Sequence, residues 1–247
     1  MVDIDIIKSK GESYYENCEK NGICFSFLRL GFCTNCLRRR AAAVSSTATV
    51  AGDMEDAVQT AESTFGEGIL IAYFSVPETD GVDTVAGASR VVVDGEVLGN
   101  NQYIAQLIQQ EIGGDLFRIE TIQEYPGSHD PLLEFAYNER AEDARPELAA
   151  QIESPDSYDV IFLGYPNWNA DLPMPLYTFL EEYDFSGKTI IPFTAHGGSG
   201  FSRTIRTIQE LQPNATVIDD GLSISRNRVA DAQDDVISWI SGLNIAP

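Results

Sequence analysis

Four cysteines lie within nineteen residues near the N-terminus, and the chain has no others. In a reducing cytosol, clustered thiols are more typical of a metal site than of disulfide bonds. Four thiolates suit the tetrahedral coordination of zinc or of an iron–sulfur cluster. We therefore predict a zinc or iron–sulfur site, while redox-active or disulfide thiols, or a segment with no such role, stay open as alternatives. The ligands of this site would be Cys18, Cys24, Cys33 and Cys36.

Two later segments have the composition of ligand-binding loops. The segment Gly164–Asn169 places Trp168 among a proline and two asparagines, where burial in a core is less natural for a tryptophan. The other tryptophan, Trp239, lies in an amphipathic pattern that predicts a core position. The segment His196–Gly200 holds three glycines, which let a backbone approach a ligand closely. Because His129 is the only other histidine, a histidine metal site is excluded.

An alternation of short apolar strands and amphipathic helices positions these loops. The predicted strands are 69–74, 115–120, 158–164, 189–194 and 216–218, and the predicted helices are 101–112, 131–143, 174–183, 201–211 and 228–241. Strands separated by helices pair in parallel, with helices on both faces of the sheet. The sequence therefore predicts the α/β class, with a doubly wound, five-stranded parallel sheet. Ligands bind such sheets beyond the carboxyl ends of the strands, which selects the loops after the first, third and fourth strands.

The residues in these loops resemble the flavodoxin family, in its bacterial flavodoxin-like branch with a Gly-Tyr-Pro-x-Trp loop and a His-Gly-Gly-Ser-Gly loop. The resemblance runs from about residue 69 to residue 243. It implies a flavodoxin-like fold that binds flavin mononucleotide (FMN). The residues it implies for the cofactor site are Ser75, Gly99, Asn100, Asn101, Tyr165, Pro166, Asn167, Trp168, Asn169, His196, Gly197, Gly198, Ser199 and Gly200.

The resemblance also implies a role for each loop. Ser75 and Gly99–Asn101 would hold the phosphate at a helix start, whose free N–H groups make a lysine or arginine unnecessary. Trp168 would cover the isoalloxazine ring, and Asn169 stands where relatives often have a second aromatic residue, which leaves one flavin face more open. The backbone of His196–Gly200 would bind the pyrimidine edge, and His196 is the one catalytic candidate.

A long insertion, Val76–Leu98, departs from the short phosphate loop of many flavodoxins. Within it, Asp94-Gly95 stands between runs of β-branched residues, which is a strong signal for a β-hairpin. Such a hairpin could form a wall over the flavin or simply decorate the surface.

The charge divides the chain into unlike parts. The net charge of all 247 residues is −22, yet residues 1–40 hold seven Lys/Arg and only five Asp/Glu. We predict a Cys-rich N-terminal segment (1–40), a linker (41–68) and an FMN-binding domain (69–247). So acidic a chain repels nucleic acids, and no apolar run is long enough for a membrane span. We expect a cytoplasmic protein.

Three functions fit these features. The first is electron transfer, in which bound FMN passes electrons between a reductase and an acceptor, with the acidic surface favouring a basic partner protein. The alternative is an NAD(P)H-dependent reductase that uses bound FMN to reduce a small-molecule acceptor such as a flavin, quinone or nitro-compound. A third interpretation is a non-redox interaction module.

Overall fold

The computed structural model describes residues 68–77 and 90–243 of the chain. The four cysteines, the predicted segment 1–40 and all but the last residue of the predicted linker 41–68 lie outside the described residues. The predictions made for them, including the domain boundaries, stay predictions.

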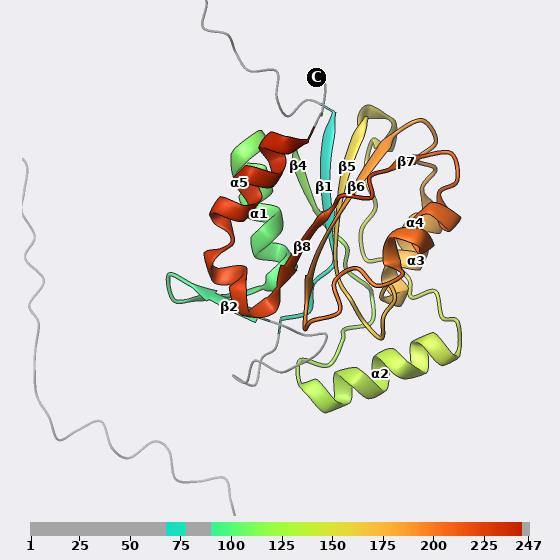
Figure 1. Ribbon diagram of the computed structural model, residues 1–247. Coiled ribbons are helices and arrows are strands. Elements are labelled where there is room, and N and C mark those ends of the chain that lie inside the picture. Colours follow the sequence, from blue (N-terminus) through green and yellow to red (C-terminus); the bar gives the residue numbers. More distant parts are fainter. Residues whose placement is uncertain (1–67, 78–89, 244–247) are drawn as a thin grey trace, which may run out of the picture. The chain divides into compact units, whose positions relative to one another are not determined.

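The predicted doubly wound parallel sheet is confirmed (Figure 1). Its strands follow the order β4-β1-β5-β6-β7, and β8 pairs with β6 beside β7. Every pairing in this sheet is parallel. The strands are β1 (Ile69–Tyr73), β4 (Asp115–Arg118), β5 (Val160–Pro166), β6 (Thr189–His196), β7 (Thr216–Val217) and β8 (Leu222–Ser225). The order reverses between β1 and β5, which is the switch point where ligands bind in such sheets.

Helices cover both faces of the sheet. Figure 1 shows α1 and α5 on one face and α3 and α4 on the other. Their bounds are α1 (Asn100–Ile112), α2 (His129–Ala141), α3 (Met174–Glu182), α4 (Thr204–Leu211) and α5 (Gln233–Gly242), with short 3-10 turns at η1 (Pro155–Ser157) and η2 (Arg226–Asp231). Among the described residues, no helix is long and apolar enough to cross a membrane.

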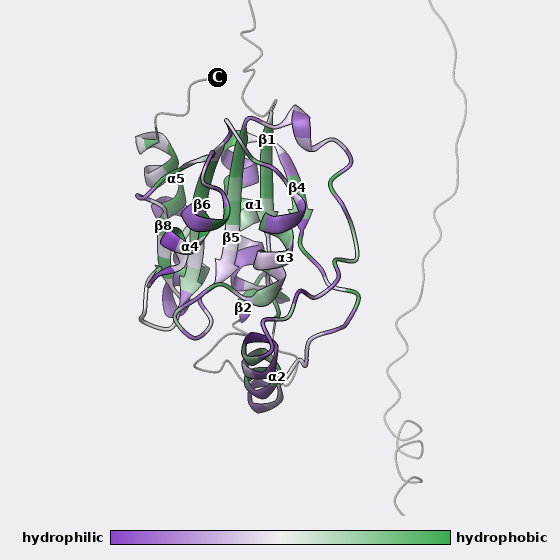
Figure 2. Ribbon diagram, turned by 90° about the vertical axis from the view of Figure 1, so that its right-hand side faces the viewer, coloured by the Kyte–Doolittle hydropathy of each residue, from purple (hydrophilic) through white to green (hydrophobic). Residues whose placement is uncertain are grey.

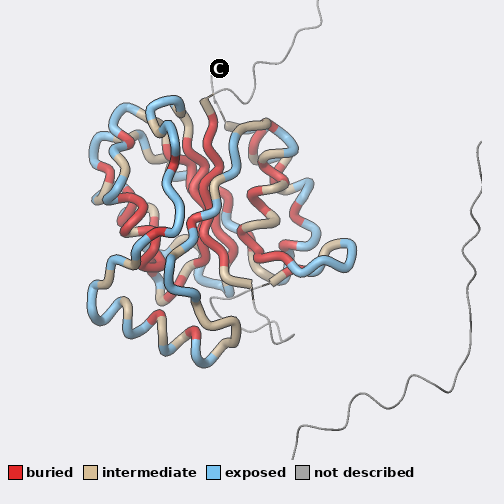
Figure 3. Tube along the Cα trace, turned by 180° about the vertical axis from the view of Figure 1, so that it is seen from behind, coloured by how far each residue is buried: buried red, intermediate tan, exposed pale blue. Residues whose placement is uncertain are grey.

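Burial on both faces explains why the central strands are continuously apolar. In β1, Ile69 and Ile71 face the α1 and α5 side, whereas Leu70 and Ala72 face the α3 and α4 side. A strand covered on both sides has no polar face to alternate with. The central strands are accordingly the most hydrophobic part in Figure 2 and the most buried part in Figure 3.

The fifth strand position differs from the prediction, because two short strands share it. The predicted strand 216–218 corresponds to β7, but β8 was not predicted. The break between them lies opposite Pro192 of β6, which has no N–H to donate to a neighbouring strand. Position 221, within this break, requires glycine, because a Cβ atom there would clash with the Pro192 carbonyl oxygen at 2.3 Å.

The last helix also begins later than predicted. Residues 226–231 form the turn η2, and α5 starts only at Gln233. Val229 of η2 is fully buried, while Asp234 and Asp235 lie in the first turn of α5, where negative charge stabilises a helix N-terminus. The sequence predicted one helix over 228–241 because the apolar residues of η2 and α5 follow a single helical spacing.

The predicted hairpin is confirmed. Strands β2 (Arg90–Val93) and β3 (Glu96–Gly99) pair antiparallel around Asp94 and Gly95, both at positive φ. Two successive positive φ values are the type I′ geometry that matches the twist of paired strands. The hairpin leads directly into α1 at the carboxyl edge of the sheet.

Candidate functional site

The loop after β1 meets the start of α1 through a very close contact. Ser75 is buried, and a Cβ atom on Gly99 would lie 2.1 Å from the Ser75 Oγ atom. Only glycine therefore fits at position 99. The contact brings together two predicted site residues that 23 intervening residues separate in the sequence.

Asn100, the first residue of α1, is the most unusual side chain of the site. It is only 2% exposed, and neither its Oδ1 nor its Nδ2 atom has a hydrogen-bond partner within the described part of the chain. A buried amide without partners is costly and demands an explanation. It lies at a helix N-terminus, where free N–H groups and the helix dipole favour an anion. The arrangement suits a phosphate group.

Asn101 has a different role from Asn100. Its Oδ1 atom accepts the Ala195 backbone N–H at 2.9 Å, which ties the start of α1 to the end of β6. The sequence predicted the same role for both asparagines. In the structure, Asn101 links α1 to β6, whereas the Asn100 amide has no partner among the described residues.

The segment after β5 is fixed by hydrogen bonds. Tyr165 is fully buried, and its hydroxyl donates to Thr204 at 2.9 Å. Asn167 Nδ2 donates to the Gly200 carbonyl at 2.6 Å, which joins the loop after β5 to the loop after β6. The Asn167 Oδ1 atom is buried and lacks a partner among the described residues. Of the residues predicted here, Tyr165 and Pro166 are buried parts of the strand end, and Asn167 offers an unpartnered polar atom.

Trp168 is buried, contrary to the expectation from its polar sequence surroundings. It is 6% exposed and packs against Phe74 at 5.4 Å and Tyr125 at 5.7 Å between ring centroids. Its Nε1 atom has no partner in the described residues. The sequence could not show this packing because Tyr125 comes from the distant segment between β4 and α2. Trp239, as predicted, packs on the core, with its ring against Phe162.

Tyr125 was missed by the sequence analysis. Its hydroxyl donates to both carboxylate oxygens of Glu139, at 2.8 and 2.6 Å, which anchors the ring beside Trp168. Burial, together with this carboxylate, raises the pKa of Tyr125. Burial also raises the pKa of Glu139, although the Tyr125 hydrogen bond opposes that rise. An aromatic residue before a proline was the only local signal for it.

The loop after β6 presents backbone to solvent. Gly197, Gly198 and Ser199 are exposed, and Gly198 and Gly200 adopt positive φ values of 132° and 56°. The Gly198 N–H donates to His196 Nδ1 at 2.9 Å, so the ring proton lies on Nε2. Burial lowers the pKa of His196, which favours this neutral form. The glycines let the loop fold back on its own histidine.

The predicted site residues thus gather at one edge of the sheet, from the ends of β1, β5 and β6. Within the described ranges, no group of three or more His, Cys, Asp or Glu side chains could hold a metal ion. What converges instead is a helix N-terminus, unpartnered amide atoms and exposed loop backbone. These groups fit a phosphate-bearing cofactor with polar ring edges.

This fold is that of the flavodoxin-like class of α/β protein. A family model for flavodoxins matches residues 91–243, more than half of the chain, so the chain belongs to the flavodoxin family. Among curated proteins, no sequence matches it.

Two solved structures illustrate the likeness. A Bacteroides uniformis protein assigned as a flavoprotein is 24% identical, with a TM-score of 0.50, and the match covers 71% of this chain and 99% of the other. A flavoprotein from Lactobacillus acidophilus in complex with FMN is 18% identical, with a TM-score of 0.46, over 68% of this chain and 99% of the other. The first of these shows the shared fold.

Proposed function

We propose that this flavodoxin binds FMN non-covalently and passes electrons between a reductase and an acceptor. The single observation that supports the cofactor most directly is the buried amide of Asn100 at the start of α1, which has no hydrogen-bond partner among the described residues. A phosphate oxygen would accept from Nδ2, and the free N–H groups of the helix start would bind the remaining charge. No lysine or arginine lies in the first turn of α1, so the helix end itself would supply the positive potential.

The other two loops would orient the ring system. Residues 197–199 are exposed, so their backbone groups, apart from the Gly198 N–H that already donates to His196, could meet the polar edge of a flat ring. The neutral His196 would offer its Nε2–H as a donor, since Nδ1 already accepts from Gly198. Trp168 would contact the ring through its remaining exposed edge, and Tyr125 would have to shift for a full stacking contact. When bound, the flavin supplies the electron chemistry and the protein supplies binding and orientation.

A titration with FMN and with riboflavin tests the cofactor assignment. Because riboflavin lacks the phosphate, we expect FMN to bind much more tightly. Equal affinity for the two ligands would contradict a phosphate site at α1. Absence of binding by either would favour a non-redox interaction module.

The NAD(P)H-dependent reductase stays the alternative function. Exposed backbone at Gly197–Ser199 leaves that side of the site open to a small acceptor such as a quinone. Anaerobic mixing of the FMN-loaded protein with NADH or NADPH separates the two functions. Bleaching of the flavin absorbance without a partner protein would establish the reductase, whereas an unchanged spectrum supports the carrier.

The N-terminal cysteines remain a separate proposal. We propose that Cys18, Cys24, Cys33 and Cys36 bind zinc or an iron–sulfur cluster. Metal analysis and an absorption spectrum of protein purified without air test this directly. A metal-free protein with four titratable thiols would refute it.

A further inference from the structure

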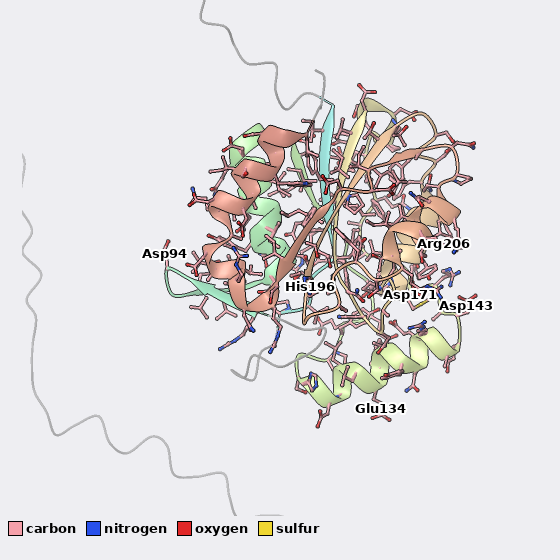
Figure 4. All side chains as sticks on the ribbon, in the orientation of Figure 1. Asp94, Glu134, Asp143, Asp171, His196 and Arg206 are labelled. Carbon is pink, nitrogen blue, oxygen red and sulfur yellow. The ribbon has the colours of Figure 1, made fainter. Side chains whose placement is uncertain are left out.

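One buried carboxylate gathers polar groups from several segments near the candidate site. Asp171 is 4% exposed and belongs to the loop after β5, on the side of the sheet where α3 lies (Figure 4). Its Oδ1 atom accepts from the Leu172 N–H at 3.0 Å and from the hydroxyls of Tyr177 and Thr207 at 3.2 Å each. Its Oδ2 atom pairs with Arg203 at 3.2 Å and Arg140 at 3.5 Å.

The same residue closes the turn that holds Trp168. The backbone N–H and C=O groups of Trp168 and Asp171 exchange two hydrogen bonds, at 3.1 and 2.9 Å. Between them, Asn169 and Ala170 adopt φ values of 53° and 61°. Arg140 adds a hydrogen bond to the Asn169 carbonyl at 2.7 Å. Trp168 is thus anchored by the turn 168–171, which ends at the buried carboxylate of Asp171.

Arg203 connects this turn to the other candidate loop. It follows the His196–Gly200 loop by three residues and immediately precedes α4. Its ion pair with Asp171 therefore joins the two loops, in addition to the Asn167–Gly200 hydrogen bond. With two such connections, neither loop can shift without the other.

Stability alone does not call for a charge at this place. Only the carboxylate is buried here, since the side chains of Arg140 and Arg203 are 40% and 60% exposed. A buried charge is often no more stabilising than well-packed apolar atoms of similar volume, but its partners must adopt one geometry. Here the geometry that is demanded is the relative placement of two loops.

We propose that Asp171 is a positioning residue that fixes the Trp168 turn against the His196–Gly200 loop through Arg203. The part of this inference that concerns flavin affinity rests on the proposed function. The part that concerns the two loops does not need a ligand.

The ligand-free test uses Trp168 as its own reporter. The chain has only two tryptophans, so Trp239→Phe leaves Trp168 as the single one. In this background, Asp171→Asn keeps the shape of the side chain but removes its charge, and Arg203→Gln removes the partner. We expect each change to raise acrylamide quenching of Trp168 towards that of the unfolded chain, and the double variant to add little further.

Arg206→Gln is the matched control. It is the same substitution three residues along the chain and breaks the exposed pair between Arg206 and Glu210. Quenching that is unchanged in the Asp171 and Arg203 variants, or raised equally in the control, would overturn the proposal. Arg203 is exposed, so its variant keeps the test decisive if Asp171→Asn fails to fold. Fluorine NMR of 5-fluorotryptophan in the chain with both tryptophans gives a second readout.

The ligand-bound test measures FMN dissociation constants. We expect about a tenfold weakening for Asp171→Asn and Arg203→Gln, equivalent to about 1.4 kcal/mol, and no change for Arg206→Gln. If the unaltered protein does not bind FMN, the proposed function fails while the quenching experiment still decides the positioning role. If quenching changes but FMN affinity does not, the link from Asp171 to the flavin is refuted.

Discussion

Replacing Asn100 with leucine should change stability and cofactor affinity in opposite directions. Leucine has the same number of side-chain heavy atoms and the same branching, and it lacks the amide. A buried polar group without a partner costs about 1–3 kcal/mol, and both polar atoms of Asn100 lack one in the described structure. We therefore expect the FMN-free protein to gain about 2 kcal/mol. For a domain of this size, the gain raises the melting temperature by about 4–8 °C.

The same change should weaken FMN binding. A hydrogen bond to a charged group contributes about 1.5–3 kcal/mol, which corresponds to about a 10- to 150-fold rise in the FMN dissociation constant. Binding of riboflavin should change far less, because the lost bond is to the phosphate. Calorimetric melting of the FMN-free protein and fluorescence titrations with both ligands measure these effects.

Asn138→Leu serves as the control for this prediction. Asn138 lies on α2 and is exposed, so its replacement relieves no buried amide and should neither stabilise the protein nor alter FMN affinity. A less stable Asn100→Leu variant that binds FMN normally would refute the reasoning. That result would mean that the amide is satisfied by ordered water and has no ligand.

Four further predictions follow from the geometry. Ala170→Gly should stabilise the protein by about 1 kcal/mol in thermal melts, because alanine is strained at a φ of 61°, and an unchanged melting temperature would contradict this. Trp168→Ala should lower the free energy of unfolding by about 3–5 kcal/mol, since the ring is buried in the core, and should also weaken FMN binding. Trp239→Ala should lower stability alone. Denaturant melts measure the stability of both variants, and FMN titrations measure their affinity. His196 should titrate below the ordinary value of about 6.5 in NMR, with loss of the Gly198 N–H hydrogen bond on protonation; a pKa above that value would count against the neutral loop. Because the unfolded chain then binds the proton first, stability should fall as pH drops below about 6.5, and less so in His196→Asn.

The positions and parallel direction of the main strands were predictable because both of their faces are covered. Continuous apolar runs such as 69–74 leave few other structures open, and the helices between them require parallel pairing. Strand β8 was missed because its two serines leave only Leu222 and Ile224 as apolar signals in four residues. Its place in the sheet depends on Pro192, a residue of another strand.

The candidate site was predictable in position but not in detail. Loops after known strands could be assigned to one edge of the sheet without any side-chain geometry. The difference between Asn100 and Asn101 depends on which amide meets Ala195, and the burial of Trp168 depends on Tyr125. Asp171 gave no signal at all, since its partners come from three helices and an intervening loop. Such contacts between distant segments are not encoded in local spacing.

The contact between Ser75 and Gly99 means that the insertion between them leaves and rejoins the domain at one place. A two- or three-residue turn could span this place, although it would remove Val91 and Leu98, which are buried in the core. A longer peptide could be grafted there at little further entropic cost, because loop closure depends only weakly on length. A sensor or affinity peptide inserted at this point would emerge beside the proposed phosphate site, where cofactor binding could report on its occupancy.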